Sequence, residues 1–148
     1  MINTASNLIM IRPKHFNYNI ETAGNNFFQK RIDKISRRQI KEKSVTEFNQ
    51  LVKILKENYV EIDVYDDRED IITTDSIFPN NWFSLHRDGS LYLYPMFSKN
   101  RRKERREDII TDLQKRYSVK NIVDLTSYEK ENKFLEGTGS MVFDRKNK

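Results

Sequence analysis

The sequence predicts a mixed α/β fold, because helix and strand patterns alternate and the order repeats along the chain. An amphipathic helix expected at 45–58 leads to a strand at 60–64, and a second helix at 105–117 leads to a strand at 121–125. Each strand is followed by a short segment that carries a polar residue. Two helix–strand units in this order predict a small sheet module that the chain uses more than once.

The helix at 45–58 has the clearest signature in the sequence. Ser44 and Glu47 have the spacing of a capping box, which marks the start of a helix. An apolar stripe follows at the helical period, formed by Val45, Phe48, Leu51, Val52 and Leu55. A further helix is expected at 25–35, with four apolar residues on roughly one face: Phe27, Phe28, Ile32 and Ile35. The helix at 105–117 turns three residues inward: Ile109, Ile110 and Leu113.

Two strands are indicated by apolar or alternating runs. Residues 7–12 form an apolar run that ends at Pro13, as a buried strand does. Residues 60–64 alternate between apolar and acidic side chains, which is the period of a strand with one buried face. Both runs are therefore expected in the sheet module.

A hairpin and a last strand pair complete the expected elements. Residues 82–86 and 90–94 are expected to pair across a turn that contains Asp88-Gly89, a strong hairpin signal. Residues 134–136 and 140–143 are expected as the last strand pair, interrupted by Gly-Thr-Gly.

Composition excludes several kinds of site. The 148 residues contain no cysteine, so the chain cannot supply a disulfide, a zinc–thiolate site, an iron–sulfur cluster or a thiol nucleophile. No apolar run approaches the ~20 residues of a membrane span, and no signal pattern opens the sequence, so a cytoplasmic location is expected. His15 and His86 are the only histidines, and neither stands in a metal-ligand pattern. We expect no metal and no cofactor.

The net charge of +5 leaves the kind of partner open. Basic residues concentrate at 37–43 and 99–106, which is compatible with a nucleic-acid footprint. However, an acidic run lies at 66–70, and no nucleic-acid motif with stacking aromatics accompanies the basic stretches. A solvated basic face is the preferred interpretation.

Several segments are more specific than a generic scaffold requires. They lie at 12–16 (Arg-Pro-Lys-His-Phe), 21–26 (Glu-Thr-Ala-Gly-Asn-Asn), 78–84 (Phe-Pro-Asn-Asn-Trp-Phe-Ser), 94–106 and 135–140 (Leu-Glu-Gly-Thr-Gly-Ser). Together they resemble the amidinotransferase-like family associated with citrulline utilisation. That family is part of the guanidine-modifying enzymes, with arginine deiminase, agmatine deiminase and dimethylarginine hydrolase.

The resemblance implies a five-bladed α/β propeller of the pentein type. Those enzymes are usually about twice as long, so residues 1–148 are expected to form the N-terminal part of one amidinotransferase-like domain, with two to three blades. In the family a cysteine attacks the central carbon of a guanidinium or ureido group, while a histidine and a glutamate assist proton transfer. Because the chain lacks that cysteine, we expect it to be inactive alone.

The resemblance also implies site residues. Glu136 matches a glutamate that hydrogen-bonds substrate nitrogen and assists proton transfer; otherwise it is a strand-end carboxylate beside a glycine turn. Asn81 stands where related deiminases have an aspartate, and Asn80 precedes it. An amide can face a neutral ureido group, which suggests a citrulline-like substrate; otherwise the asparagine pair caps a turn. Arg101, or Arg102 in another register, is expected to bind the substrate's carboxylate, or to begin a solvated helix.

Other function classes stay open at this point. The expected partner is a small guanidino or ureido amino acid, and a complementing C-terminal half or a homodimer is possible. A non-catalytic ligand-binding or complementation module and a basic interaction protein are the alternatives. The sequence assigns no role to His15, His86 or the segment 21–26.

Overall fold

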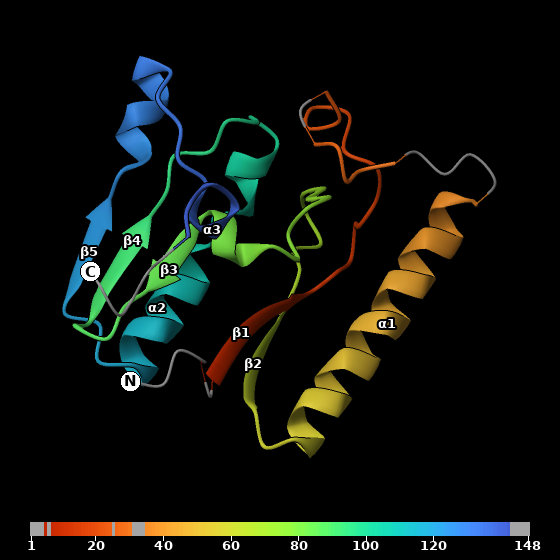
Figure 1. The fold of residues 1–148 in the computed structure, drawn as a ribbon, viewed down its shortest axis with the longest axis horizontal. Helices are drawn as coiled ribbons and strands as arrows, with labels where there is room; N and C mark the ends of the chain where they lie inside the picture. The colour runs from red at the N-terminus through yellow and green to blue at the C-terminus, as the bar shows by residue number, and fades with distance from the viewer. Residues whose placement is uncertain (1–4, 6, 25, 31–34, 143–148) are drawn as a thin grey trace. The chain divides into compact units, whose positions relative to one another are not determined.

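A computed structural model describes residue 5 and residues 7–24, 26–30 and 35–142. The chain divides into two compact units, Met1–Phe78 and Pro79–Lys148, here called the N-terminal unit and the C-terminal unit (Figure 1). Each contains strands and at least one helix, which confirms the predicted mixed α/β class. The number of propeller blades stays a prediction.

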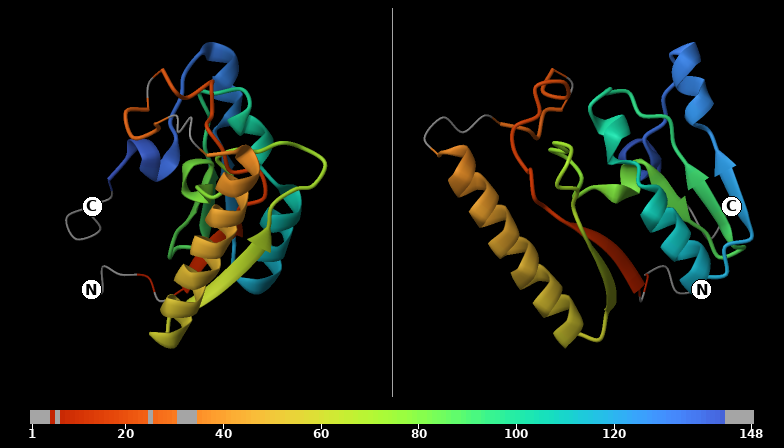
Figure 2. Two further views of the ribbon diagram at one scale, coloured as in Figure 1. Left: turned by 90° about the vertical axis from the view of Figure 1, so that its right-hand side faces the viewer. Right: turned by 180° about the vertical axis from the view of Figure 1, so that it is seen from behind.

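The N-terminal unit is built on two parallel strands joined by a long helix. Strands β1 (Asn7–Arg12) and β2 (Glu61–Asp66) pair in register from Asn7 opposite Glu61 to Arg12 opposite Asp66. Parallel strands need a crossover connection, and helix α1 (Arg37–Glu57) lies within it, alongside the strand pair (Figure 2). Both strands lie close to their predicted positions.

Helix α1 begins eight residues before its predicted start, 45 minus 37. Ser36, not Ser44, is the N-cap: its Oγ accepts a hydrogen bond from Gln39 N at 3.3 Å, and Gln39 Oε1 accepts one from Ser36 N at 3.0 Å. Ser44 Oγ instead donates to Lys41 O within the helix. The polar residues between the two serines are good helix formers, so nothing there ends the helix. The basic stretch 37–43 therefore forms its first two turns.

The helix predicted at 25–35 is wrong over residues 26–30, which the structure describes. Residues 26–30 form turns and irregular backbone, and residues 25 and 31–34 lie outside the described part of the chain. Phe27 and Phe28 are 93% and 97% exposed, so they form no buried helical face. Local hydrogen bonds compete successfully with the helix, since Asn26 Oδ1 accepts from Phe28 N at 3.1 Å.

The C-terminal unit contains a three-stranded mixed sheet. Strands β3 (Phe83–Leu85) and β4 (Ser90–Leu93) are antiparallel, and β5 (Asn121–Asp124) pairs with β4 in parallel. Helix α2 (Glu107–Arg116) connects β4 to β5 and lies against one face of the sheet (Figure 1). The predicted hairpin, helix and strand of this unit are all confirmed.

The C-terminal unit has an apolar core between α2 and the sheet. Leu91, Ile109 and Leu113 have no exposed surface, and Trp82 is 1% exposed. Burial of such side chains stabilises the folded state by roughly 1.5–3 kcal/mol each. The hairpin turn that precedes β4 contains Gly89 at φ +86°, and a Cβ there would lie 2.6 Å from Ser118 O. Glycine is thus required at this turn.

Three short 3₁₀ helices and one helical turn complete the described residues of the C-terminal unit. They are η1 (Pro79–Asn81), η2 (Arg101–Glu104), η3 (Thr126–Glu131) and α3 (Gly137–Ser140). The strand pair predicted at 134–136 and 140–143 is wrong over its described residues, because residues 134–136 are irregular and α3 follows them directly. Gly137 has φ +42°, which lies outside the range of a strand, so the chain turns at this residue and cannot continue as extended backbone.

Candidate functional site

Residues 80 and 81 and the Gly-Thr-Gly segment 137–139 lie together in the C-terminal unit, and we call these five residues the asparagine–glycine cluster. Asn80 Nδ2 donates hydrogen bonds to Asn81 Oδ1 at 2.9 Å and to Thr138 Oγ1 at 2.7 Å. Helix η1 thereby contacts α3, although the two are far apart in sequence. The structure thus places two of the residues predicted from the sequence, Asn80 and Asn81, directly beside the segment that follows a third, Glu136.

The two glycines of the cluster permit this contact. A Cβ on Gly137 would lie 2.1 Å from Asn80 O, and a Cβ on Gly139 would lie 3.0 Å from Asn81 Oδ1. Gly137 also has the positive φ that residues with a side chain rarely adopt. Glycine at these two positions therefore lets the segment 137–139 approach the backbone of Asn80 and the side chain of Asn81.

Two contacts hold the carboxylate of Glu136 in place. Oε1 accepts a hydrogen bond from Phe97 N at 2.9 Å, and Oε2 lies 3.6 Å from Arg101 Nη1. The side chain keeps 22% of its surface exposed. A partly exposed carboxylate fixed on one oxygen by a backbone donor can accept a hydrogen bond from a ligand on the other.

Arg101 lies inside the C-terminal unit and not on a solvated helix end. Its Nε and Nη2 donate to Glu104 Oε1 at 3.1 Å and Oε2 at 3.0 Å, and the two side chains are 6% and 1% exposed. This fork-to-fork pair places a positive charge beside Glu136. Direct contact of Arg101 with a ligand carboxylate stays a prediction.

Arg102, the other register, is also engaged in internal contacts. Its Nε donates to Met96 O at 2.9 Å and lies 3.3 Å from Glu129 Oε2. The guanidinium carbon lies 5.8 Å from the ring centre of Phe134, within cation–π range. Through these contacts, Arg102 helps to hold the segment 96–104 in place.

Glu129 joins three segments of the C-terminal unit. Its carboxylate accepts hydrogen bonds from Met96 N at 2.8 Å and from Arg105 Nη1 at 2.5 Å and Nη2 at 3.1 Å. Burial acts to raise the pKa of Glu129, but the hydrogen bonds from Arg105 and Met96 N and the charges of Arg105 and Arg102 outweigh it and hold the pKa below the usual 4.5. The ionised form is therefore the one the fold stabilises.

Replacing Glu129 with glutamine is expected to destabilise the chain by about 2 kcal/mol at neutral pH, because it removes charged hydrogen bonds to buried groups. Since the pKa is lowered on folding, the stabilisation is complete above the ordinary glutamate range and is lost as pH falls through the lowered value. The wild type should therefore lose more stability than the variant between neutral and acid pH in urea unfolding. Glu131→Gln, which removes an exposed pair with Lys133, is the control. Equal acid sensitivity of wild type and Glu129→Gln would contradict this role.

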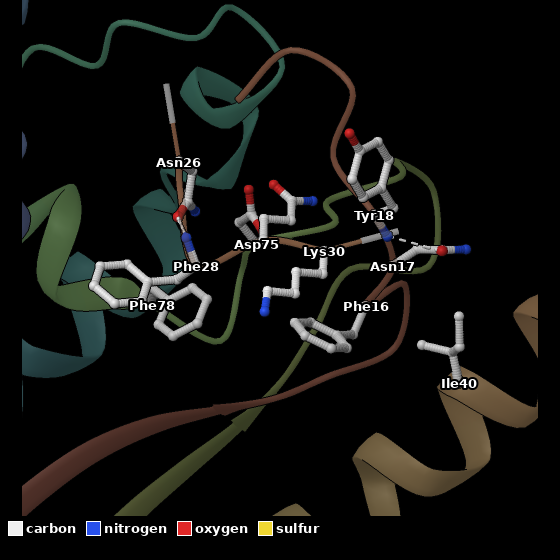
Figure 3. A pocket seen from close by; sticks show the side chains of 10 residues that line it. Phe16, Asn17, Tyr18, Asn26, Phe28, Lys30, Ile40, Asp75 and Phe78 are labelled. Atoms are coloured by element: carbon white, nitrogen blue, oxygen red, sulfur yellow. Dashed lines mark hydrogen bonds between the residues drawn. The ribbon is translucent and has the colours of Figure 1, made fainter. Parts of the chain in front are cut away.

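The N-terminal unit contains a cavity of about 300 Å³ that the sequence did not indicate. Lys30, Asp75 and Phe78 project around it (Figure 3). Its aromatic walls come from Phe16, Tyr18, Phe28 and Phe78. A carboxylate and an ammonium among aromatic faces suit a small polar or charged ligand. Three lining residues, Phe16, Asn26 and Phe78, belong to the specific segments 12–16, 21–26 and 78–84, and this was the signal available in the sequence.

The loop that carries Asp75 is organised by a buried carboxylate. Asp67 is 6% exposed and accepts hydrogen bonds from Thr73 Oγ1 at 2.8 Å and from Ser76 Oγ at 2.7 Å. His15 Nε2 lies 2.9 Å from Arg68 O, so this histidine ties the segment after β1 to the same loop. His15 therefore has a structural contact in the N-terminal unit.

His86 belongs to a polar chain on the β3–β4 hairpin. Its Nε2 lies 2.8 Å from Ser84 Oγ, which is also 2.7 Å from the Tyr94 hydroxyl.

Over the described residues, no group of three or more histidine, aspartate or glutamate side chains is placed to hold a metal ion. No helix in that part of the chain is both long enough and apolar enough to cross a bilayer.

Solved structures share the fold of this chain. Unliganded AgrE superposes with a TM-score of 0.62 at 22% sequence identity, over 94% of this chain and 18% of the AgrE chain. ArgZ, described as an arginine dihydrolase from the ornithine–ammonia cycle in cyanobacteria, superposes with a TM-score of 0.60 at 20% identity, over 94% of this chain and 19% of its own. The chain thus spans less than a fifth of the length of either structure.

Two AgrE complexes are among these structures. One is a cysteine-to-alanine variant with L-arginine, and the other contains ornithine and NAD⁺; both have a TM-score of 0.62 at 22% identity. No curated protein shows a significant match to the sequence.

The sequence itself matches a family model. The model is that of the eukaryotic N,N-dimethylarginine dimethylhydrolases, and it matches residues 12–148. This span includes every specific segment described above, and it agrees with the likeness of fold to AgrE and ArgZ. The resemblance to the guanidine-modifying enzymes is confirmed, and the chain belongs to the N,N-dimethylarginine dimethylhydrolase family.

Proposed function

We propose that residues 1–148 form the N-terminal part of an enzyme domain that modifies a guanidino or ureido C–N bond. Family membership supports this class of reaction, and the small share of AgrE and ArgZ that the chain spans supports a partial domain. The arginine and ornithine present in AgrE support a small amino acid as the ligand. In this proposal the chain supplies two to three of five blades.

The observation that carries the proposal is the placement of the asparagine–glycine cluster beside Glu136. Asn80 donates hydrogen bonds to Thr138 and to Asn81, and the Glu136 carboxylate accepts one from Phe97 N. We assign Glu136 to hydrogen-bond a nitrogen of the substrate and to assist proton transfer. Asn81 faces the planar group of the substrate, and Asn80 orients Asn81.

The amide of Asn81 favours a neutral planar group. A guanidinium carries donors only and pairs best with a carboxylate, whereas a ureido group offers a carbonyl acceptor as well as donors. An amide complements the ureido group with one donor and one acceptor. A citrulline-like substrate is therefore preferred over arginine.

Arg101 is proposed to act at the same place. Its guanidinium is held in place by Glu104 and Glu136, in position to meet the carboxylate of the ligand. Arg102 is the alternative contact for that ligand carboxylate.

The covalent step of the proposed reaction needs a thiol from outside this chain. The 148 residues contain no cysteine, and removing the nucleophile from groups that act as a unit abolishes most of the rate. We therefore propose that the isolated chain binds ligand without turnover, as a complementing partner would. A homodimer of the chain would lack the thiol as well.

A basic interaction protein is the weaker alternative. Two of the four basic residues at the start of α1 pair with acidic neighbours, Arg38 with Glu42 at 2.8 Å and Lys43 with Glu47 at 3.8 Å. These pairs reduce the positive charge that this face presents to a nucleic acid.

Calorimetric titration of the isolated chain with L-citrulline and L-arginine tests the proposal. We expect citrulline to bind more tightly, and Asn81→Asp to reverse the preference by about tenfold, because a carboxylate pairs with guanidinium. Asn49→Asp, an exposed position on α1, is the matched control and should leave the preference unchanged. No release of ammonia, urea or ornithine should accompany binding. Turnover by the isolated chain, or a preference that ignores residue 81, would contradict the proposal.

A further inference from the structure

The two units share one arrangement of strand, helix and parallel strand, but their sheets differ in size. In the N-terminal unit β1, α1 and β2 follow one another as β4, α2 and β5 do in the C-terminal unit (Figure 1). In the C-terminal unit a third strand, β3, pairs antiparallel with β4 on the side away from β5. Over the described residues, no strand pairs with β1 on the side away from β2. The N-terminal unit therefore has a strand edge where the C-terminal unit has β3.

One hydrogen bond ends the parallel pairing in both units and aligns β1 with β4. Leu125 N donates to Leu93 O at 3.0 Å, and Asp67 N donates to Arg12 O at 3.3 Å. Arg12 thus corresponds to Leu93, which lies opposite Phe83 of β3. The position that β3 fills in one unit is therefore the outer edge of the C-terminal half of β1 in the other.

The backbone of β1 points alternately toward β2 and away from it. Arg12 directs its carbonyl toward β2, because that oxygen accepts from Asp67 N. The N–H and C=O of one residue lie on the same side of an extended strand, and the side alternates from residue to residue. Ile9 and Ile11 therefore direct both groups toward the outer edge. A further strand on this edge would hydrogen-bond to these two residues.

The side chains of β1 do not protect this edge. Edge strands usually carry a charge, a proline or a bulge that prevents pairing with another chain. Residues 8–11 are all apolar (Leu-Ile-Met-Ile), and the first charge of the strand is at Arg12. β2, in contrast, carries Glu61 and Asp63 at alternate positions. The outer edge of β1 thus has the sequence of a strand that is paired on both sides.

We propose that β1 of a second copy of this chain pairs with this edge, so that two copies form one sheet in the order β2–β1–β1–β2. Identical strands related by a two-fold axis run antiparallel, which is the orientation of β3 on β4. The incoming strand has to be apolar on both faces to match residues 8–11, and β1 meets this condition whereas β2 does not. The inference uses only the N-terminal unit and does not depend on the proposed ligand.

Hydrogen bonding selects the register of the two copies. In an antiparallel pair, mutually hydrogen-bonded residues must both point toward the partner strand. Ile9 opposite Ile11 of the second copy satisfies this condition in both directions. Met10 then lies opposite Met10 of the second copy, as a pair without mutual hydrogen bonds, with about 4.5 Å between the two Cα atoms. The two-fold axis therefore passes through the Met10 pair.

Cross-linking tests this register, because the natural chain contains no cysteine. Met10→Cys should form a covalent dimer in the presence of oxidised glutathione, since the expected Cα distance is within the range of a disulfide. Ile54→Cys on α1, where the natural side chain is 56% exposed, is the control and should cross-link much more slowly. A Met10→Cys chain that cross-links no faster than Ile54→Cys would overturn the proposal.

The unmodified chain provides a second test. Sedimentation equilibrium should show a monomer–dimer equilibrium, and the Ile9 and Ile11 amides should exchange more slowly with solvent as the protein concentration rises. Ile9→Pro removes an N–H at the outer edge and none that bonds to β2, so it should weaken the dimer at least about tenfold. Ile54→Ala should leave the dimer unchanged.

A chain that stays monomeric at every concentration would show that another strand, or none, takes this edge. If the Ile9 and Ile11 amides of that monomer are protected, a segment of the same chain covers the edge. If they exchange rapidly, the edge is left to a strand of another protein. Either result would contradict pairing between two copies, as would a dimer that Ile9→Pro leaves intact.

Discussion

Glu104→Ala is expected to cost the chain about 3–5 kcal/mol of folding free energy, because it leaves the buried Arg101 guanidinium without its bidentate partner. The Glu104 side chain is 1% exposed and that of Arg101 is 6% exposed, so water cannot replace the lost contacts. Urea unfolding followed by circular dichroism measures the loss. Lys103→Ala, an exposed position in the same 3₁₀ helix, is the control and should change stability by less than about 0.5 kcal/mol.

A double variant separates the pair from its surroundings. Replacing both Arg101 and Glu104 with methionine removes both charges together, and buried pairs replaced in this way often lose little stability. We expect the double variant to be more stable than Glu104→Ala but to loosen Glu136, which then lacks the arginine at 3.6 Å. A Glu104→Ala variant as stable as the wild type would show that the pair is not buried in solution.

The second large effect is expected from Gly137→Ala, at about 2–3 kcal/mol. The added Cβ would lie 2.1 Å from Asn80 O, which is backbone and cannot move aside cheaply, and the residue has φ +42°. The variant should separate α3 from η1 and release Asn80 and Asn81, so their backbone and side-chain signals in ¹⁵N spectra should shift.

Gly24→Ala is the matched control for Gly137→Ala. A Cβ at Gly24 meets nothing within 4 Å, so this change should be neutral or slightly stabilising through the unfolded state. Unchanged Asn80 and Asn81 signals in Gly137→Ala would contradict the contact between the Gly-Thr-Gly segment and the asparagine pair.

Local signals predicted the elements whose structure is decided locally. The Asp88-Gly89 turn specifies the β3–β4 hairpin. The apolar run at 7–12 specifies β1, although Ile11 is its one fully buried residue and not the whole strand as predicted. The start of α1 was predicted eight residues too late because the sequence contains two capping patterns, Ser36-x-x-Gln39 and Ser44-x-x-Glu47. No Gly or Pro lies between them to end a helix that begins at the first pattern.

Contacts between distant segments decide what the sequence could not show. The backbone at Gly137 turns where it packs on Asn80, so a pattern that looks like a strand pair folds as a helical turn. Likewise, the hydrogen bond from Asn19 to Asp75 joins two loops of the N-terminal unit that lie 56 residues apart in the sequence. The residue types at 80, 81 and 136 were indicated by family resemblance, whereas their mutual distances come from the fold.

The central claim is that this chain recognises a small ureido or guanidino amino acid through the asparagine–glycine cluster. Its most direct test is a ¹H–¹⁵N titration of the wild-type chain with L-citrulline. We predict saturable shifts of the Asn81 side-chain amide and of the Gly139 backbone amide, with the basic residues of α1 unaffected. No shift at Asn81 and Gly139 at saturating citrulline and at saturating arginine would contradict the claim.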